Sequence, residues 1–336
     1  MAVRSFYDKY RVIFSGRYLL ITLNSTLLFL ASFFLVHFLT HLVTGLSALY
    51  CEISTTLNYT MVDFHIRYWE WTPEMVIIVF TVPALFSIGI ALLCSAAFMK
   101  RQSAREFFKR IRYFTKKQRY RHKKEQRKRE IERQVQRLSQ AAPAEQDPQR
   151  RSGRRRLPWS LRLFLLWTMY HSLTYFFSGM LYAFLFHRRF GYVIWYAFNN
   201  FFFDVLFSVI ALLSMLAIGY YYAVQIFHSG RMYLGTLNER NRMPFAVSQT
   251  LLPFIAGTII TVLLQLPQFD PSLVLLNFSF LFFLLPLSAR SARQPSLHFA
   301  REDPPAKVFW GWLLFAALVV TGILIAVKIG IPLHKA

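Results

Sequence analysis

The chain contains long apolar blocks, several of them close to the ~20 residues that a helix needs to cross the hydrocarbon core of a bilayer. Hydrophobic residues make up 55% of the sequence and charged residues only 16%. A soluble domain of this length would carry roughly 25% charged residues. Block length and composition therefore predict an all-α fold, a polytopic transmembrane helical bundle with about seven spans.

The apolar blocks divide the chain into four parts. An interfacial helix is expected over residues 1–18, where Phe6, Tyr10, Ile13 and Phe14 share one helical face. Spans 1 and 2 with their outer loop occupy residues 19–99, a basic helix and linker residues 100–157, and spans 3 to 7 residues 158–336. The predicted spans cover residues 19–46, 75–98, 161–186, 197–226, 245–266, 272–287 and 308–331.

Most of the net charge of +23 lies between the second and third spans. The stretch from Lys100 to Arg156 holds 22 Lys and Arg against six acidic residues, a local charge of +16. Basic residues beside an anionic leaflet each contribute on the order of 1 kcal/mol to binding. Nucleic acid is a weaker candidate, because the most basic part lacks the aromatic side chains on which bases stack. Anionic lipid headgroups or an acidic protein are the expected partners of Lys109, Arg110, Arg112, Lys116, Lys117, Arg119, Lys123 and Lys124.

The distribution of Lys and Arg over the loops predicts the orientation. The N-terminus and the loops at 100–156, 227–244 and 288–307 are the basic ones, and alternating crossings place all four on one side. The positive-inside rule makes that side cytoplasmic, so the C-terminus is expected outside. Short loops and the lack of an organelle signal favour the bacterial inner membrane.

The residues most suited to chemistry are His37 and His41 in the first span. At i and i+4 they share a helix face, and two imidazoles at this spacing can bind a transition metal such as zinc. Asp204 in the fourth span falls at a similar depth and is the expected third ligand. Polar groups at membrane depth favour a functional interpretation. An outward-facing polar pocket is therefore predicted from His37, His41, His171, Asn199, Asn200 and Asp204, with a merely structural polar cluster as the alternative.

The sequence His37-Phe-Leu-Thr-His41, followed by Gly45, resembles the HExxH helix of the site-2 intramembrane metalloproteases. The sequence VPALFSIG in the second span is loosely similar to the following helix of that family, and Asp204 would stand in for its distant aspartate ligand. Phe38, however, occupies the position of the catalytic glutamate, and no LDG motif surrounds Asp204. Without a general base to activate a metal-bound water, the resemblance implies at most an inactive relative.

Three functions from different classes are compatible with these features. The leading interpretation is a non-enzymatic membrane protein, acting in transport or in a membrane complex, because the sequence contains no Walker A loop, dinucleotide fingerprint or GxSxG elbow. The second is a metal-binding membrane enzyme, or its inactive relative, that uses the His37/His41 pair. The third is a scaffold that acts through the basic cytoplasmic arm.

Overall fold

The computed structural model describes residues 15–58, 61–98, 158–185, 189–234, 236–265, 271–293, 297–298, 308–328 and 330–333. The chain forms two units, one of residues 1–95 and 159–336 and the other of residues 96–158. The second unit lies outside the described residues except at its ends. The predicted interfacial helix, for most of its length, and all of the predicted lipid-binding arginines and lysines also lie outside them.

The described part of the chain is mostly helical, which agrees with the predicted fold class. Five helical stretches are long and apolar enough to cross a membrane, at residues 16–50, 73–97, 201–232, 239–264 and 273–291. The helices of the first half are α2 (Gly16–Tyr50), α3 (Pro73–Phe98), α6 (Trp159–Leu181), α7 (Phe190–Phe198) and α8 (Phe201–Ser229).

The helices of the second half are shorter and interrupted. A π-helical turn, η5 (Val247–Leu251), joins α9 (Glu239–Ala246) to α10 (Leu252–Gln265). The next crossing segment consists of α11 (Pro271–Ser279), α12 (Leu281–Leu284) and α13 (Pro286–Arg293). The last helix is α14 (Trp310–Lys328). The 3₁₀ turns η2 (Tyr68–Glu70) and η4 (Gly230–Met232) complete the helical elements described here.

Most helix boundaries differ by a few residues from those expected, and three differences change how the helices are divided. The third predicted span ends at Leu181 instead of residue 186, and the fourth begins at Phe201 instead of residue 197. A separate helix, α7, stands between them, because Asn199 adopts a left-handed conformation that ends α7 and Asn200 caps the start of α8. The sixth predicted span is divided into three helices, with Pro286 at the start of the last one.

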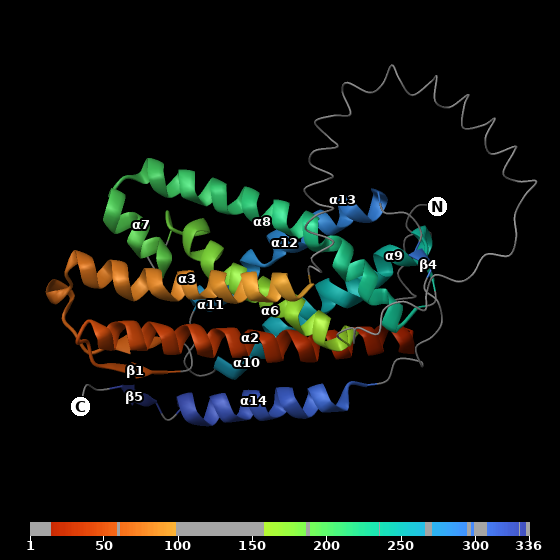
Figure 1. The fold of residues 1–336 in the computed structure, drawn as a ribbon, viewed down its shortest axis with the longest axis horizontal. Helices are drawn as coiled ribbons and strands as arrows, with labels where there is room; N and C mark the ends of the chain where they lie inside the picture. Colours follow the sequence, from red (N-terminus) through yellow and green to blue (C-terminus); the bar gives the residue numbers. More distant parts are fainter. Residues whose placement is uncertain are drawn as a thin grey trace, which may run out of the picture. The chain divides into compact units, whose positions relative to one another are not determined.

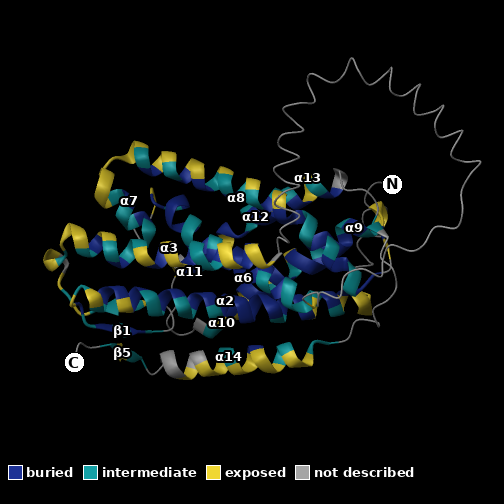
Figure 2. Ribbon diagram, viewed as in Figure 1, coloured by how far each residue is buried: buried dark blue, intermediate teal, exposed yellow. Residues whose placement is uncertain are grey.

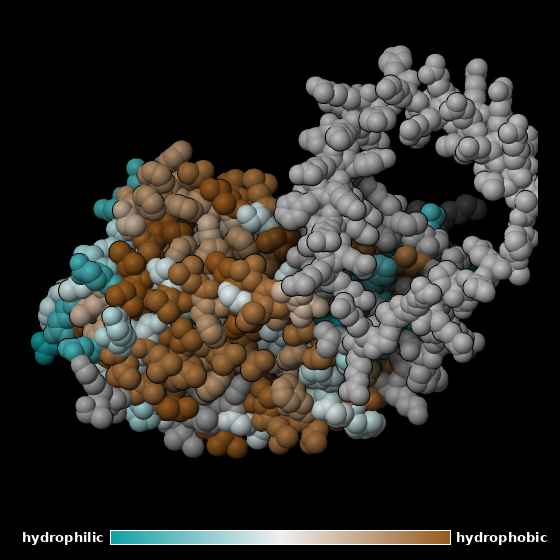
Figure 3. Space-filling model, viewed as in Figure 1, coloured by the Kyte–Doolittle hydropathy of each residue, from teal (hydrophilic) through white to brown (hydrophobic). Residues whose placement is uncertain are grey.

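Helices α2 and α6 form the interior of the described bundle. Helix α2 packs against α6, α14 and α10, and α6 also packs against α8. Both are mostly buried, whereas α3, α8 and α14 present exposed faces (Figure 2). These faces are apolar, as the brown surface in Figure 3 shows, and they include Leu93, Leu213 and Leu318. An extended apolar surface of this kind is suited to contact with lipid.

Two small sheets tie distant loops together, at opposite ends of α2 (Figure 1). At one end β1 (Thr55–Leu57) pairs antiparallel with both β2 (Val62–Phe64) and β5 (Ile331–Leu333), in register Thr55 to Phe64 and Thr55 to Leu333. At the other end β3 (Thr236–Leu237) pairs antiparallel with β4 (Leu297–His298). Strands cannot pair across a bilayer, so the loops joined in each sheet lie on the same side of the bundle.

Gly219 allows a close approach between α8 and α12. A Cβ added at Gly219 of α8 would overlap the backbone of Phe283 in α12, including its carbonyl oxygen. Backbone atoms cannot move aside as a flexible side chain can, so the two helices must separate if the glycine is replaced. Small residues permit close contacts of this kind between membrane helices, whose association depends on packing and hydrogen bonds.

We expect Gly219→Ala to destabilise the protein by about 1–3 kcal/mol, as overpacking of a tight interior generally does. The measurement is the midpoint of thermal unfolding in detergent. Gly89→Ala is the matched control, because a Cβ at Gly89 in α3 meets no atom within 4 Å. Equal midpoints for the two variants would contradict the close contact between α8 and α12.

Candidate functional site: buried polar residues of α2

Buried polar residues lie along most of α2. Asn24, Ser25, Ser32, His37, Thr40, His41 and Thr44 are all less than a tenth exposed. Most of these hydroxyls donate to carbonyls three or four residues earlier in the helix, as Thr40 does to Val36 at 2.8 Å. The imidazoles and the Asn24 amide cannot be satisfied in this way, so they must find partners on other elements.

His37 and His41 lie against each other, with ring centroids 4.0 Å apart. Their i, i+4 spacing produces this contact directly. The ring of His37 stacks on Phe33 at 5.5 Å. His41 hydrogen-bonds the backbone of Asn58, at the end of β1, and also lies within electrostatic range of Arg189. Both histidines therefore lie toward the end of the bundle that carries the three-stranded sheet.

His171 lies deeper in the bundle, within a group of aromatic rings. The centroid of Phe29 is 4.5 Å from that of His171, Phe280 is at 5.3 Å and Phe33 at 5.5 Å. The imidazole hydrogen-bonds the backbone of Phe29, and its buried Nε2 atom has no hydrogen-bond partner among the described residues. Rings from α2, α6 and the break between α11 and α12 thus surround His171, at a level of α2 between the His37/His41 pair and Ser25.

The other predicted pocket residues take different positions. Asn199 and Asn200 are exposed, and the Asn200 side chain accepts a hydrogen bond from the Phe202 amide at 2.9 Å. Asp204 is buried in the first turn of α8, where a carboxylate is favoured by the helix dipole, and its Oδ1 atom has no partner among the described residues. At the break between α7 and α8, Asn199 ends α7, Asn200 caps the start of α8, and Asp204 lies in the first turn of α8.

No group of three or more His, Cys, Asp or Glu side chains within the described ranges is close enough to hold a metal ion. His37 and His41 therefore form a two-residue pair there, and Asp204 does not join them as a third ligand. The reason is tertiary: a similar depth expected from the sequence does not determine which helix faces meet. Whether the pair binds a metal stays a prediction.

A second polar cluster, not expected from the sequence, lies toward the other end of α2. Trp167 Nε1 donates to Ser25 Oγ at 3.1 Å, and Gln249 Nε2 donates to the same oxygen at 3.2 Å. Ser25 Oγ in turn donates to the Gln249 carbonyl at 2.7 Å, and Thr22 donates to the Ser248 carbonyl at 3.1 Å. Gln249 and Ser248 belong to the π-helical turn η5, whose wider winding frees backbone carbonyls, and such turns frequently occur at functional sites.

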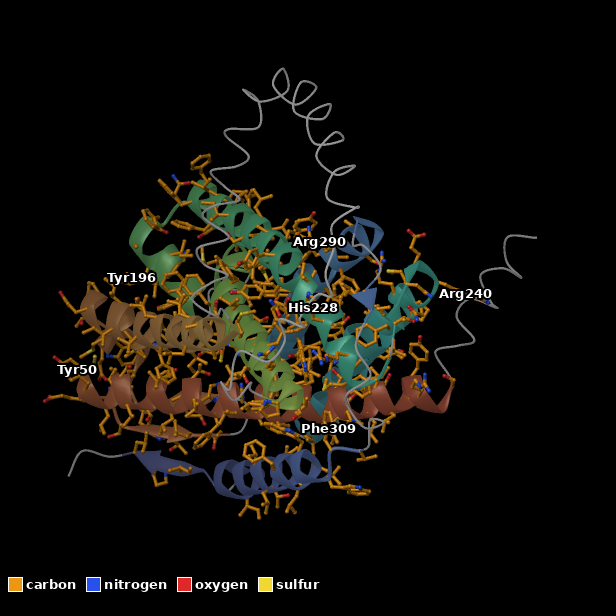
Figure 4. All side chains as sticks on the ribbon, turned by 45° about the vertical axis from the view of Figure 1, so that its right-hand side comes forward. Tyr50, Tyr196, His228, Arg240, Arg290 and Phe309 are labelled. Carbon is orange, nitrogen blue, oxygen red and sulfur yellow. The ribbon has the colours of Figure 1, made fainter. Side chains whose placement is uncertain are left out.

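Asn24 extends this cluster to two further elements. Its Oδ1 atom accepts from the backbone amide of Phe309, just before α14, at 3.0 Å. Phe309 lies beside α2 in Figure 4. The Asn24 amide donates to the Tyr233 hydroxyl at 3.5 Å, and burial raises the pKa of that phenol, which therefore stays protonated. The triplets Asn24-Ser25-Thr26 and Ser248-Gln249-Thr250, each in an apolar stretch, are the sequence signal that could have indicated this cluster.

Comparisons with protein-family models, curated proteins and solved structures give no match. The resemblance to the intramembrane metalloproteases therefore rests on short sequence similarities alone, chiefly the motif around His37 and His41.

Ser25→Ala is expected to destabilise the protein by about 1–3 kcal/mol, because it leaves the buried Trp167 and Gln249 donors without an acceptor. The change would be measured as a lower midpoint of thermal unfolding in detergent. The control is Ser288→Ala, which removes an exposed serine whose hydroxyl bonds only its own helix region, at the Leu285 carbonyl. If both variants unfold at the wild-type temperature, the cluster does not hold α2, α6 and η5 together.

Proposed function

We propose that the chain is a seven-span integral membrane protein of the bacterial inner membrane that acts in transport. Helices α6 and α14 are the two crossings added to the five apolar stretches. Helix α6 has 23 residues, enough to span, and its many polar residues are buried between α2 and α8 rather than exposed to lipid. Helix α14 has 19 residues and ends beside β5.

Seven crossings agree with the pairing of the strands. Six crossings separate β1 from β5 and two separate β3 from β4, so each pair of loops returns to one side. The loops that carry β3 and β4 are the ones rich in Lys and Arg, which favours the cytoplasm for that side. The N-terminus then lies inside, and the C-terminus, next to β5, lies outside.

The observation that carries the transport proposal is the combination of buried polar residues along α2 with two interrupted helices beside it. The π-helical turn η5 contacts α2 directly, and Phe280 at the break between α11 and α12 lies 5.9 Å, between ring centroids, from Phe29 of α2. Discontinuous helices next to polar groups at membrane depth are how transporters build substrate sites, since irregular backbone is tolerated only where it is buried or lines a cavity.

The aromatic group around His171 serves as the barrier in this proposal. Phe29, Phe33 and Phe280 separate the His37/His41 pair from the Ser25/Gln249 cluster. A transporter must close one side of its path while the other is open, and a layer of packed rings between two polar groups meets that need. Rearrangement at the η5 turn and at the α11–α12 break would open it.

Cysteine labelling tests this proposal. The two native cysteines are first replaced, by Cys51→Ser and Cys94→Ser. In this background, we expect Thr40→Cys and Ser32→Cys to react with a charged, membrane-impermeant maleimide added outside intact cells. The reason is that alternate conformations admit water to the buried polar residues of α2. Leu85→Cys on the lipid-exposed face of α3 is the control and should stay unreactive, since the reagent does not enter lipid.

If neither Thr40→Cys nor Ser32→Cys reacts with the maleimide, a transport path is contradicted, and a structural role remains for the buried polar residues of α2. Labelling from the cytoplasmic side alone would reverse the proposed orientation. Labelling at Thr40→Cys without labelling at Ser32→Cys would place the barrier between them, at the level of the aromatic group.

A second candidate function, metal binding, is favoured by the 4.0 Å contact between the His37 and His41 rings. If this pair holds a metal such as zinc, detergent-purified protein should contain about one equivalent by mass spectrometry, and a His37→Ala/His41→Ala variant should lose it. Folded protein that is free of metal in both forms would contradict this function. The nearby Arg189 cation acts against binding of a metal cation, which is why transport is the leading proposal.

A further inference from the structure

Arg242 is a fully buried arginine near the end of the bundle that carries the β3–β4 sheet. It lies on α9, is only 2% exposed, and is one of the largest completely buried side chains among the described residues. Its Nη1 atom donates to the carbonyl oxygen of Ser291 in α13. Its Nε and Nη2 atoms are also buried and have no hydrogen-bond partner among the described residues.

The two unpartnered atoms form one edge of the guanidinium group. The Nε–H and one Nη2–H bond point in parallel from that edge, at the spacing of two oxygens of a carboxylate or phosphate. The bond to Ser291 uses the Nη1 end and leaves this edge unused. The position therefore provides the part of arginine that is best suited to bidentate binding of an oxyanion.

The charge of Arg242 needs a counter-ion that its described neighbours do not provide. A guanidinium stays protonated, and an unpaired charge is very costly to bury. Among the described acids, Glu239 alone belongs to α9, and it is exposed. Nearby α13 adds a further cation, Arg290, which donates to the Tyr220 hydroxyl at 3.1 Å and whose buried Nε atom also has no partner among the described residues.

We propose that the Nε/Nη2 edge of Arg242 binds a phosphate group. Phosphate provides two or three oxygens in the required geometry and carries the negative charge that the described neighbours of Arg242 do not provide. The group can come from the headgroup of an anionic phospholipid in the adjacent leaflet or from free phosphate in the cytoplasm. This site is independent of the proposed transport path, and its failure would leave the cysteine-labelling result unaffected.

The test uses full-length protein, purified in detergent without phosphate and stripped of lipid. One arm titrates inorganic phosphate by calorimetry. The other measures, by native mass spectrometry, the phosphatidylglycerol retained after exposure to mixed phosphatidylglycerol and phosphatidylcholine micelles. We expect wild-type protein to bind one equivalent in one of the two arms, which identifies the source of the phosphate group.

Arg242→Met should weaken that binding at least about thirtyfold, as loss of one partner of a buried charge-assisted contact generally does. Arg242→Lys keeps the charge but loses the paired donors, so it should bind with intermediate affinity. Arg240→Gln is the matched control and should bind as wild type, because Arg240 is exposed on the outer side of the same helix (Figure 4). Arg240→Gln also removes one positive charge, but it leaves the proposed site unchanged.

Folding is not expected to obscure the result. Arg242→Met replaces an uncompensated buried charge with an apolar side chain of similar length, so without phosphate it should unfold at or above the wild-type temperature. If Arg242→Met does not fold, the comparison of Arg242→Lys with Arg240→Gln decides the question. The proposal is overturned if wild-type protein binds neither phosphate nor phosphatidylglycerol, or if Arg242→Met binds as tightly as wild type.

Discussion

The contact between α2 and α6 is the interaction on which the other packing depends. Each helix buries polar side chains that lipid cannot satisfy, so each must face another helix. The Trp167 indole binds Ser25, and the His171 ring lies against Phe29 while hydrogen-bonding its backbone. Because α2 and α6 satisfy each other's polar groups, the remaining helices can surround them and present apolar faces to lipid.

The interruptions in the surrounding helices follow from the same constraint. At η5 the π-helical winding releases the carbonyls of Ser248 and Gln249, and hydroxyls of α2 bind them. At the break between α11 and α12, Phe280 fills the space beside His171. Each irregularity thus lies where α2 or α6 supplies compensating contacts. At η5 the irregular winding thus supplies hydrogen-bond partners for the hydroxyls of Thr22 and Ser25.

The sequence predicted the membrane class and most helix positions, because bilayer thickness determines how long an apolar block must be. It did not predict the break at Asn199 and Asn200, since apolar residues on both sides make the hydropathy continuous. The adjacency of His37 and His41 follows from i, i+4 spacing alone. The separation of Asp204 from them, and the bond between Ser25 and Gln249 across 224 residues, depend on how helices rotate against one another, which periodicity does not determine.

The charges of the described residues are divided between the two ends of the bundle. Glu52, Asp63, Glu70 and Glu74 lie in or beside the end with the three-stranded sheet, and Asp204 starts α8, whereas the opposite end has one described acid, Glu239. That end carries Arg231, Arg240, Arg242 and Arg290. The positive-inside rule accounts for an excess of arginine in the loops on one side of a membrane protein, but it requires only that the arginines be exposed there. The burial of Arg242 goes beyond what topology explains, because a charge taken out of water needs an anion in the water's place.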